Sequence, residues 1–190
     1  MPLDLGSRLD SVPTSSLRSV AAAAGVAFMA LTLPMQLWER RMRATGGPGI
    51  VGLQLAADPD AADNVLTAWA RPGRRAARQQ TVADFAYLKT YAYAGVCGAE
   101  LLRRRAVPGS RWDRSGRVVR WLPVVAASAD AAENVLLLRT LAAADRGSVP
   151  TERTVRATLA VAVTKFGLLG ASIGWAVGAA VIGARSNRGR

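Results

Sequence analysis

The stretch SVAAAAGVAFMALTLPMQLW, residues 19–38, runs for twenty residues without a charged side chain. At ~1.5 Å per helical residue, this length crosses a hydrocarbon core of ~30 Å. Arg18 precedes the stretch and the charged run ERRMR follows it, with Trp38 at the expected interface. We therefore expect a membrane-spanning helix near 17–38. A cleaved signal peptide is the alternative reading of the same stretch, but no clear cleavage site follows it.

Residues 157–184 form a second apolar stretch, in which Lys165 is the only charged side chain. Gly170, Gly174 and Gly178 recur in it at every fourth position. That spacing lets another helix approach closely inside a membrane. The partner expected at these glycines is another membrane protein or a second copy of this chain.

Two further segments, 83–102 and 119–141, have the length of a span but carry charged residues. Such segments cross a membrane when their polar groups face other helices. The sequence therefore predicts an all-α polytopic bundle of about four transmembrane helices. Two spans around an amphipathic helical middle, or a soluble helical domain, are the alternatives.

The bundle is expected as a single domain, 17–184, with tails at 1–16 and at the basic residues 185–190. Arginine-rich connectors with Pro and Gly turn signals are expected at 71–80 and 103–117. The density of arginine in the second of these favours both termini in the cytoplasm. The connector 50–70 is amphipathic, and its apolar side chains are expected to lie on the membrane surface or to cover one mouth of the bundle: Leu53, Leu55, Val65, Leu66 and Trp69.

The net charge of +12 arises from 25 basic residues, of which only Lys89 and Lys165 are lysines. An excess of Arg together with abundant Ala is typical of a GC-rich bacterial genome, and the patterns of nucleic-acid-binding modules are missing. We therefore expect the cytoplasmic membrane as the location and the lipid bilayer as the partner, with no nucleic acid.

Histidine is absent and Cys97 is the single cysteine. These two facts exclude histidine-based zinc, haem and triad sites and an intrachain disulfide, so no metal or cofactor is expected.

The segment DAAENVLLL, residues 130–138, places polar groups inside an expected span. Asp130, Glu133 and Asn134 follow i, i+3, i+4 spacing and therefore share one helix face. Both lysines also fall in expected spans, at a similar depth. We expect an inward-facing polar cluster in which two lysines balance two carboxylates, formed by Asp130, Glu133, Asn134, Lys165, Lys89 and Tyr91.

Three roles for this cluster are open. It is a structural ion-pair network that fixes helix register, or a proton or small-molecule site, or a catalytic site. In the catalytic alternative Asp130, Glu133 or Asp84 acts as general acid on a lipid or isoprenoid, as in a terpene cyclase, without a metal. Tyr87, Tyr91 and Tyr93 would then line the cavity. The leading hypothesis is a non-enzymatic accessory or structural membrane protein that handles protons or small molecules.

The words DAADNVL at 60–66 and DAAENVL at 130–136 agree at six of seven positions. Each precedes an expected span that carries a lysine. A weak internal duplication is therefore a hypothesis, since repeats are common in membrane folds.

The order LTLPMQLWE, LQLA, ADFAYLKTYAY, ADAAENVLLL and VTKFGLL, between Leu31 and Leu169, resembles a group of uncharacterised bacterial, actinobacterial-type four-helix membrane proteins. The resemblance implies a membrane bundle with an aspartate and Glu-Asn motif in its third helix and a Lys-Phe pair in its fourth. It implies no activity, and Lys89 is not part of its pattern. The positions it marks are Asp84, Asp130, Glu133, Asn134, Lys165 and Phe166.

Overall fold

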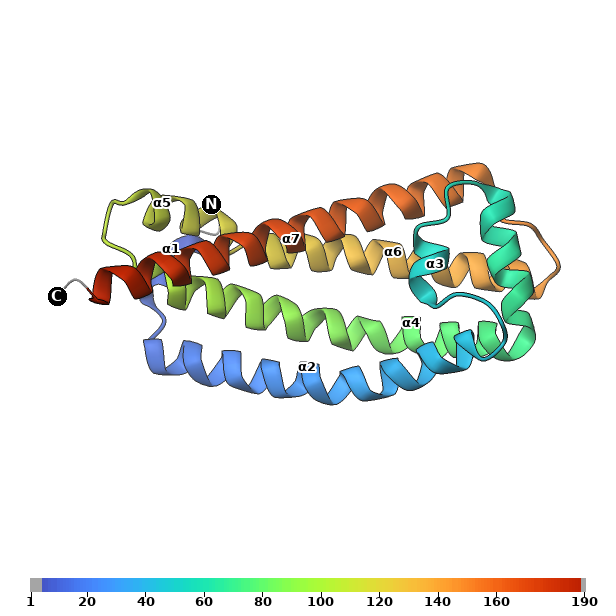
Figure 1. The fold of residues 1–190 in the computed structure, drawn as a ribbon, viewed down its shortest axis with the longest axis horizontal. Helices are drawn as coiled ribbons and strands as arrows, with labels where there is room; N and C mark the ends of the chain where they lie inside the picture. Colours follow the sequence, from blue (N-terminus) through green and yellow to red (C-terminus); the bar gives the residue numbers. More distant parts are fainter. Residues whose placement is uncertain (1–4, 189–190) are drawn as a thin grey trace.

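The structure is a computed structural model that describes residues 5–188, and within that range it is entirely helical, without a strand (Figure 1). The predicted all-α helix bundle is confirmed. Its seven helices are α1 (Leu5–Ser11), α2 (Thr14–Arg43), α3 (Ile50–Gln54), α4 (Pro59–Arg103), α5 (Arg111–Val119), α6 (Leu122–Asp145) and α7 (Glu152–Arg188).

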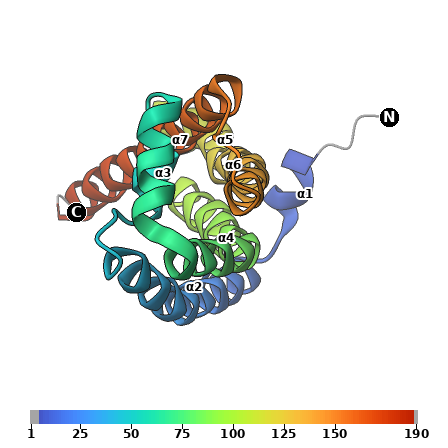
Figure 2. The ribbon, with the colours of Figure 1, turned by 90° about the vertical axis from the view of Figure 1, so that its right-hand side faces the viewer.

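Four long helical segments run antiparallel to one another (Figure 1). They are α2, the part of α4 that follows residue 70, α6 and α7. Packing contacts join α2 to α4, α4 to α6, and α6 to α7. The ends of the described chain lie at the same end of the bundle, as an even number of passes requires (Figure 1). Viewed along the bundle, α2 and α7 lie on its outside (Figure 2).

The outer helices present apolar side chains outward. Val26 and Leu33 of α2 and Ile173 of α7 are each about two-thirds exposed or more. Three helical segments are long and apolar enough to cross a membrane: Thr14–Arg43, Arg111–Asp145 and Glu152–Val181. Residues 83–102, the other expected span, are not among them. They nevertheless lie alongside α2 and α6 within the bundle.

An apolar core lies at the end of the bundle where α2 ends and α7 begins. Leu53 of α3 and Leu66 and Trp69 of α4 are buried there, together with Leu141 of α6. The indole N–H of Trp69 donates a 2.6 Å hydrogen bond to the carbonyl of Pro48. Leu53, Leu66 and Trp69 of the connector 50–70 therefore pack against one end of the bundle, whereas Leu55 of the same connector is exposed.

Two segments expected to be irregular connectors are helical instead. Residues 71–80 continue α4 beyond a kink at Ala70, whose backbone has φ 47° and ψ −161°. A proline is tolerated in the first turn of a helix, so Pro72 starts the second half of α4 without breaking it. Within 103–117, α5 begins at Arg111, after a turn, and Ser110 caps it by accepting a hydrogen bond from the Asp113 N–H through its hydroxyl. This cap was the sequence signal for the missed helix.

Candidate functional site

The polar face of α6 lies at the centre of the bundle. Asp130, Glu133 and Asn134 are 6%, 0% and 2% exposed. These low values follow from the position of α6, which has α4 on one side and α7 on the other. The i, i+3, i+4 spacing thus turns all three side chains toward neighbouring helices rather than toward the surroundings.

Lys165 of α7 is the cation of this site. Its Nζ donates a 3.0 Å hydrogen bond to Asp130 Oδ1 and lies 2.7 Å from Glu133 Oε2. The same Nζ lies 4.6 Å from the centre of the Phe166 ring, a cation–π distance. Since Lys165 is 5% exposed, these contacts replace water around its ammonium group.

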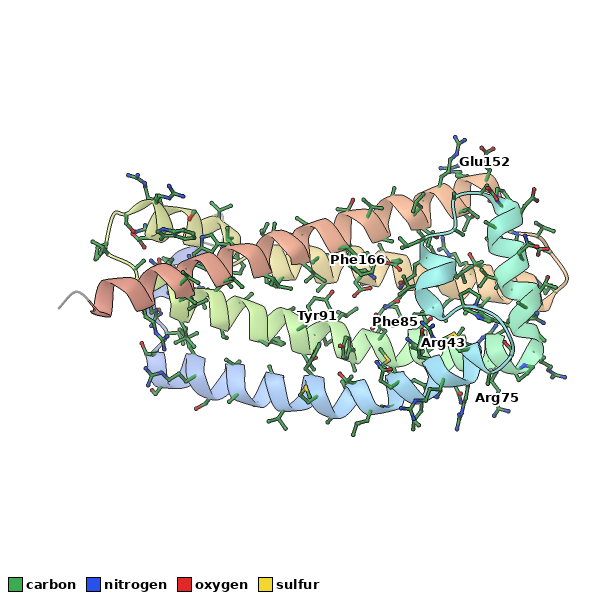
Figure 3. All side chains as sticks on the ribbon, viewed as in Figure 1. Arg43, Arg75, Phe85, Tyr91, Glu152 and Phe166 are labelled. Atoms are coloured by element: carbon green, nitrogen blue, oxygen red, sulfur yellow. The ribbon has the colours of Figure 1, made fainter. Side chains whose placement is uncertain are left out.

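Side chains of α4 complete the site. The Tyr91 hydroxyl donates a 2.9 Å hydrogen bond to Asp130 Oδ2, and the Asn134 amide donates one of 2.7 Å to Asp84 Oδ2. Figure 3 shows Tyr91 and Phe166 well away from both ends of the bundle. We call Asp84, Tyr91, Asp130, Glu133, Asn134 and Lys165 the central cluster.

The prediction that Lys89 faces the inside of the bundle is wrong. Lys89 is exposed, whereas Leu88 beside it is buried. Asp84, which was not expected in the polar cluster, accepts a hydrogen bond from Asn134. The central cluster therefore holds three carboxylates against one lysine, rather than the expected two against two.

Glu133 is the carboxylate of the central cluster that lacks a described hydrogen-bond donor on one of its buried oxygens. Its side chain is fully buried, and no hydrogen-bond donor among the described residues reaches Oε1. A buried carboxylate oxygen without a donor is destabilising when the group is ionised. A proton on this carboxyl removes the charge and supplies a donor.

Other predicted positions lie outside the central cluster. Tyr93 is 61% exposed, so the expectation that it lines an internal cavity is wrong. Tyr87 stacks on Phe28 of α2, with ring centres 4.6 Å apart. Within the described residues, nothing lies within 4 Å of the Cβ that Gly170 or Gly174 lacks.

The two copies of the repeated words have opposite environments. In the first copy, Asp60 and Asn64 are exposed; in the second, the matching Asp130 and Asn134 are buried. The first copy opens α4, where Asp58 caps the helix by accepting from the Ala61 N–H. The repeated sequence segments therefore do not form equivalent sites in the structure.

A second buried ionic network lies where α4 ends and α5 begins. It was not predicted as a network. Glu100 is fully buried and receives hydrogen bonds of 2.7 to 2.8 Å from Arg103, Arg104 and Arg120. Asp10 of α1 accepts from Arg103 at 2.9 Å and from Arg120 at 2.6 Å. Residues 1–16, expected as a tail, therefore contain the helix α1, which these ion pairs attach to the bundle.

Asp113 also belongs to this second network. It accepts hydrogen bonds from Arg103 at 2.6 Å and from Arg117 at 3.3 Å, so three carboxylates face four arginines. The sequence carried a partial signal for this network, since Glu100 precedes Arg103 and Arg104 by one helical turn. The contribution of Asp10 had no such signal, because 90 residues separate it from Glu100.

Comparison of the chain with protein-family models, with curated proteins and with solved structures found no match. Within the part of the chain that the structure describes, no group of three or more acidic or cysteine side chains is arranged to hold a metal ion. Cys97 is buried as a free thiol. The chemistry available at the central cluster is that of carboxyl, ammonium, phenol and amide groups.

Proposed function

We propose that this protein is a non-enzymatic integral membrane protein that crosses the membrane four times and binds protons at its central cluster. The observation that carries the proposal is the excess of carboxylates over cations in the central cluster. Asp130 and Glu133 contact the ammonium group of Lys165, and Asp84 contacts the neutral amide of Asn134. Fully ionised, these groups would leave a net charge inside the bundle, which a low-dielectric interior strongly disfavours.

Glu133 is the proposed proton-binding carboxyl. Asp130 accepts from both Tyr91 and Lys165, and Asp84 accepts from Asn134, so both are hydrogen-bonded. Glu133 Oε1 has no donor among the described residues. Ionisable groups at this depth of a membrane protein often mark proton pathways.

The four crossings are supported by the antiparallel order of the helices. Residues 83–102 run beside two of the candidate spans, so they share the depth of those spans. A fourth crossing also leaves both ends of the chain on the same side, for which we propose the cytoplasmic side of the cytoplasmic membrane. Introduced cysteines near Ser110 test this orientation, because Cys97 is buried and reacts slowly with membrane-impermeant reagents.

The alternative of acid catalysis on a lipid or isoprenoid has less support. A catalytic acid needs a space in which the reacting atom approaches it. The acids of the central cluster are instead in contact with Lys165, Tyr91 and Asn134, and the large basin of the structure is lined by other residues.

Infrared spectroscopy of the protein in lipid vesicles tests the proton proposal. A protonated carboxyl has a C=O stretching band that a carboxylate lacks. We expect this band in the wild-type protein at neutral pH and its loss in Glu133→Gln. The matched control is Glu152→Gln, which alters an exposed carboxyl at the start of α7 and leaves the band unchanged.

Two results would contradict the proposal. One is the absence of the band in the wild type between weakly acidic and neutral pH. The other is a band that survives unchanged in Glu133→Gln, Asp84→Asn and Asp130→Asn alike. If Glu133→Gln removes the band and leaves thermal stability intact, a purely structural role of the carboxyl is excluded.

A further inference from the structure

The structure contains a wide basin that is lined mostly by arginine. It measures about 1110 Å³ and lies where the end of α2 meets the kinked part of α4 and the end of α6. Figure 3 places Arg75 at this end of the bundle. The charged side chains lining it are Arg41, Arg71, Arg74, Arg75, Arg78 and Asp145.

The charges of this arginine basin are not balanced. Asp145 pairs with Arg74 at 3.0 Å and with Arg78 at 2.6 Å. None of the ion pairs between described residues involves Arg41, Arg71 or Arg75. Five guanidinium groups therefore share one carboxylate, whereas the network around Glu100 holds three carboxylates against four arginines.

The backbone beside the basin adds to its positive potential. The conformation of Ala70 is one that side-chain-bearing residues rarely adopt, and such strain is often found at ligand sites. It ends the first half of α4, whose Leu66 carbonyl accepts a 3.1 Å hydrogen bond from Arg74. The second half then begins at the basin, and the positive end of a helix dipole favours anions.

The arginine basin lies beside the ends of the apolar stretches of α2 and α4. On α2 the uncharged run ends at Trp38, and Arg41 follows. On α4 the group of arginines at 71–78 ends at Arg78, and the next arginine is Arg103. Both helices thus change from arginine-rich to arginine-free at the basin, which is the level of lipid headgroups for a bundle in a bilayer.

We propose that the arginine basin binds a phosphate-bearing anion. Guanidinium groups match phosphate oxygens with paired, charge-assisted hydrogen bonds, and several of them in one concave site select a group of high negative charge. Arg71 and Arg75 are the residues expected to contact the phosphate, because both are exposed and free of a described carboxylate partner. The phosphate comes from a lipid headgroup or from a soluble phosphate compound.

Thermal unfolding of the full-length protein distinguishes these two sources. One arm titrates the detergent-purified protein with inorganic pyrophosphate. The other compares nanodiscs of phosphatidylcholine with nanodiscs that also contain phosphatidylglycerol. A ligand that binds the folded state raises the melting temperature. A rise in the first arm identifies a soluble phosphate compound, and a rise only with phosphatidylglycerol identifies a lipid headgroup.

The Arg71→Gln/Arg75→Gln variant tests the residues. We expect its affinity for the responding ligand to fall at least about tenfold. Arg153→Gln is the matched control, because Arg153 is exposed near the start of α7 and does not line the basin. Equal losses in the variant and the control would indicate general surface attraction and would overturn the proposal. The absence of a response to either ligand in the wild type would overturn it without any variant.

Discussion

Lys165 and Asp130 form a buried ion pair between α7 and α6, with 3.0 Å between Nζ and Oδ1, and Glu133 Oε2 lies 2.7 Å from the same ammonium group. One cation therefore holds two acidic groups that lie one helical turn apart. This arrangement joins the two helices near the middle of their length. It also makes Lys165 the residue on which the charge of the central cluster depends.

Replacement of Lys165 by Met is expected to destabilise the protein strongly. The variant leaves Asp130 and Glu133 without their cation, and breaking a buried pair in this way costs about 3–5 kcal/mol. The melting temperature in detergent measures the loss. Adding Asp130→Asn to the variant is expected to recover part of it, because the double variant removes an uncompensated charge.

Lys89→Met is the matched control for Lys165→Met. Lys89 is exposed and takes part in no described ion pair, and in the proposed four-span arrangement its removal takes a charge out of an apolar region. We expect unchanged or higher stability in lipid. Equal destabilisation by the two lysine variants would contradict the assignment of Lys165 alone to the central cluster.

Glu100→Gln is expected to weaken the network at the other end of the bundle. Three arginines lose their shared carboxylate, at a cost of about 3–5 kcal/mol by the same reasoning. Because Arg103 and Arg120 also hold Asp10, limited proteolysis is expected to cut near α1 faster than in the wild type. The exposed pair of Glu152 and Arg156 is the comparison, and Glu152→Gln is expected to change stability by less than about 1 kcal/mol. Unchanged stability and proteolysis in Glu100→Gln would show that the network does not hold α1.

The glycines of α7 are expected to respond differently to substitution. A Cβ at Gly178 would lie 2.7 Å from Trp112 Cη2, so Gly178→Ala is expected to cost about 1–3 kcal/mol. A Cβ at Gly174 meets nothing within 4 Å, so Gly174→Ala is expected to stabilise an isolated chain by up to about 1 kcal/mol. Chemical unfolding measures both.

The same glycines test the predicted contact with a second copy of the chain. If Gly170 and Gly174 pack against another helix, Gly174→Ile lowers the yield of a cross-linked dimer in membranes. Cross-linking that is unchanged by Gly174→Ile would contradict an interface at these glycines.

Ala70→Gly is expected to stabilise the protein. The φ of 47° and ψ of −161° at Ala70 cost about 1–3 kcal/mol for a residue with a side chain, and glycine adopts them freely. Ala68→Gly, two residues earlier within the regular helix, is expected to destabilise by about 0.5–1 kcal/mol. The opposite signs, read from melting temperatures, distinguish relief of strain from a general effect of glycine. A loss of stability in both variants would contradict the strained kink.

The prediction of a helical bundle succeeded because its signals are local. The uncharged run 19–38 required a helix whatever its neighbours, and the polar face of α6 followed from the spacing of Asp130, Glu133 and Asn134 alone. The sequence did not predict helices in the connectors, because proline and glycine are typical of turns. Pro72 follows a kink and occupies the first turn of a new helical segment, where proline is tolerated.

The composition of the central cluster was only partly predictable. Lys89 and Asp84 are five residues apart on α4, so they point about 140° away from each other around the helix axis. Only the rotation of α4 about its axis decides which of the two faces α6, and that rotation depends on packing against α2, α6 and α7. The structure turns Asp84 toward Asn134 and Lys89 outward, which changes a neutral cluster into an acidic one.

The long apolar helices and the polar face of α6 follow from local sequence, because each depends on residues within a few turns of one another. Which charges meet follows instead from how the helices pack. The pairs Lys165 with Asp130, Arg120 with Glu100 and Arg74 with Asp145 each join residues 20 or more positions apart. No local pattern encodes such pairs, since they form only when packed helices fix one another's rotation and register.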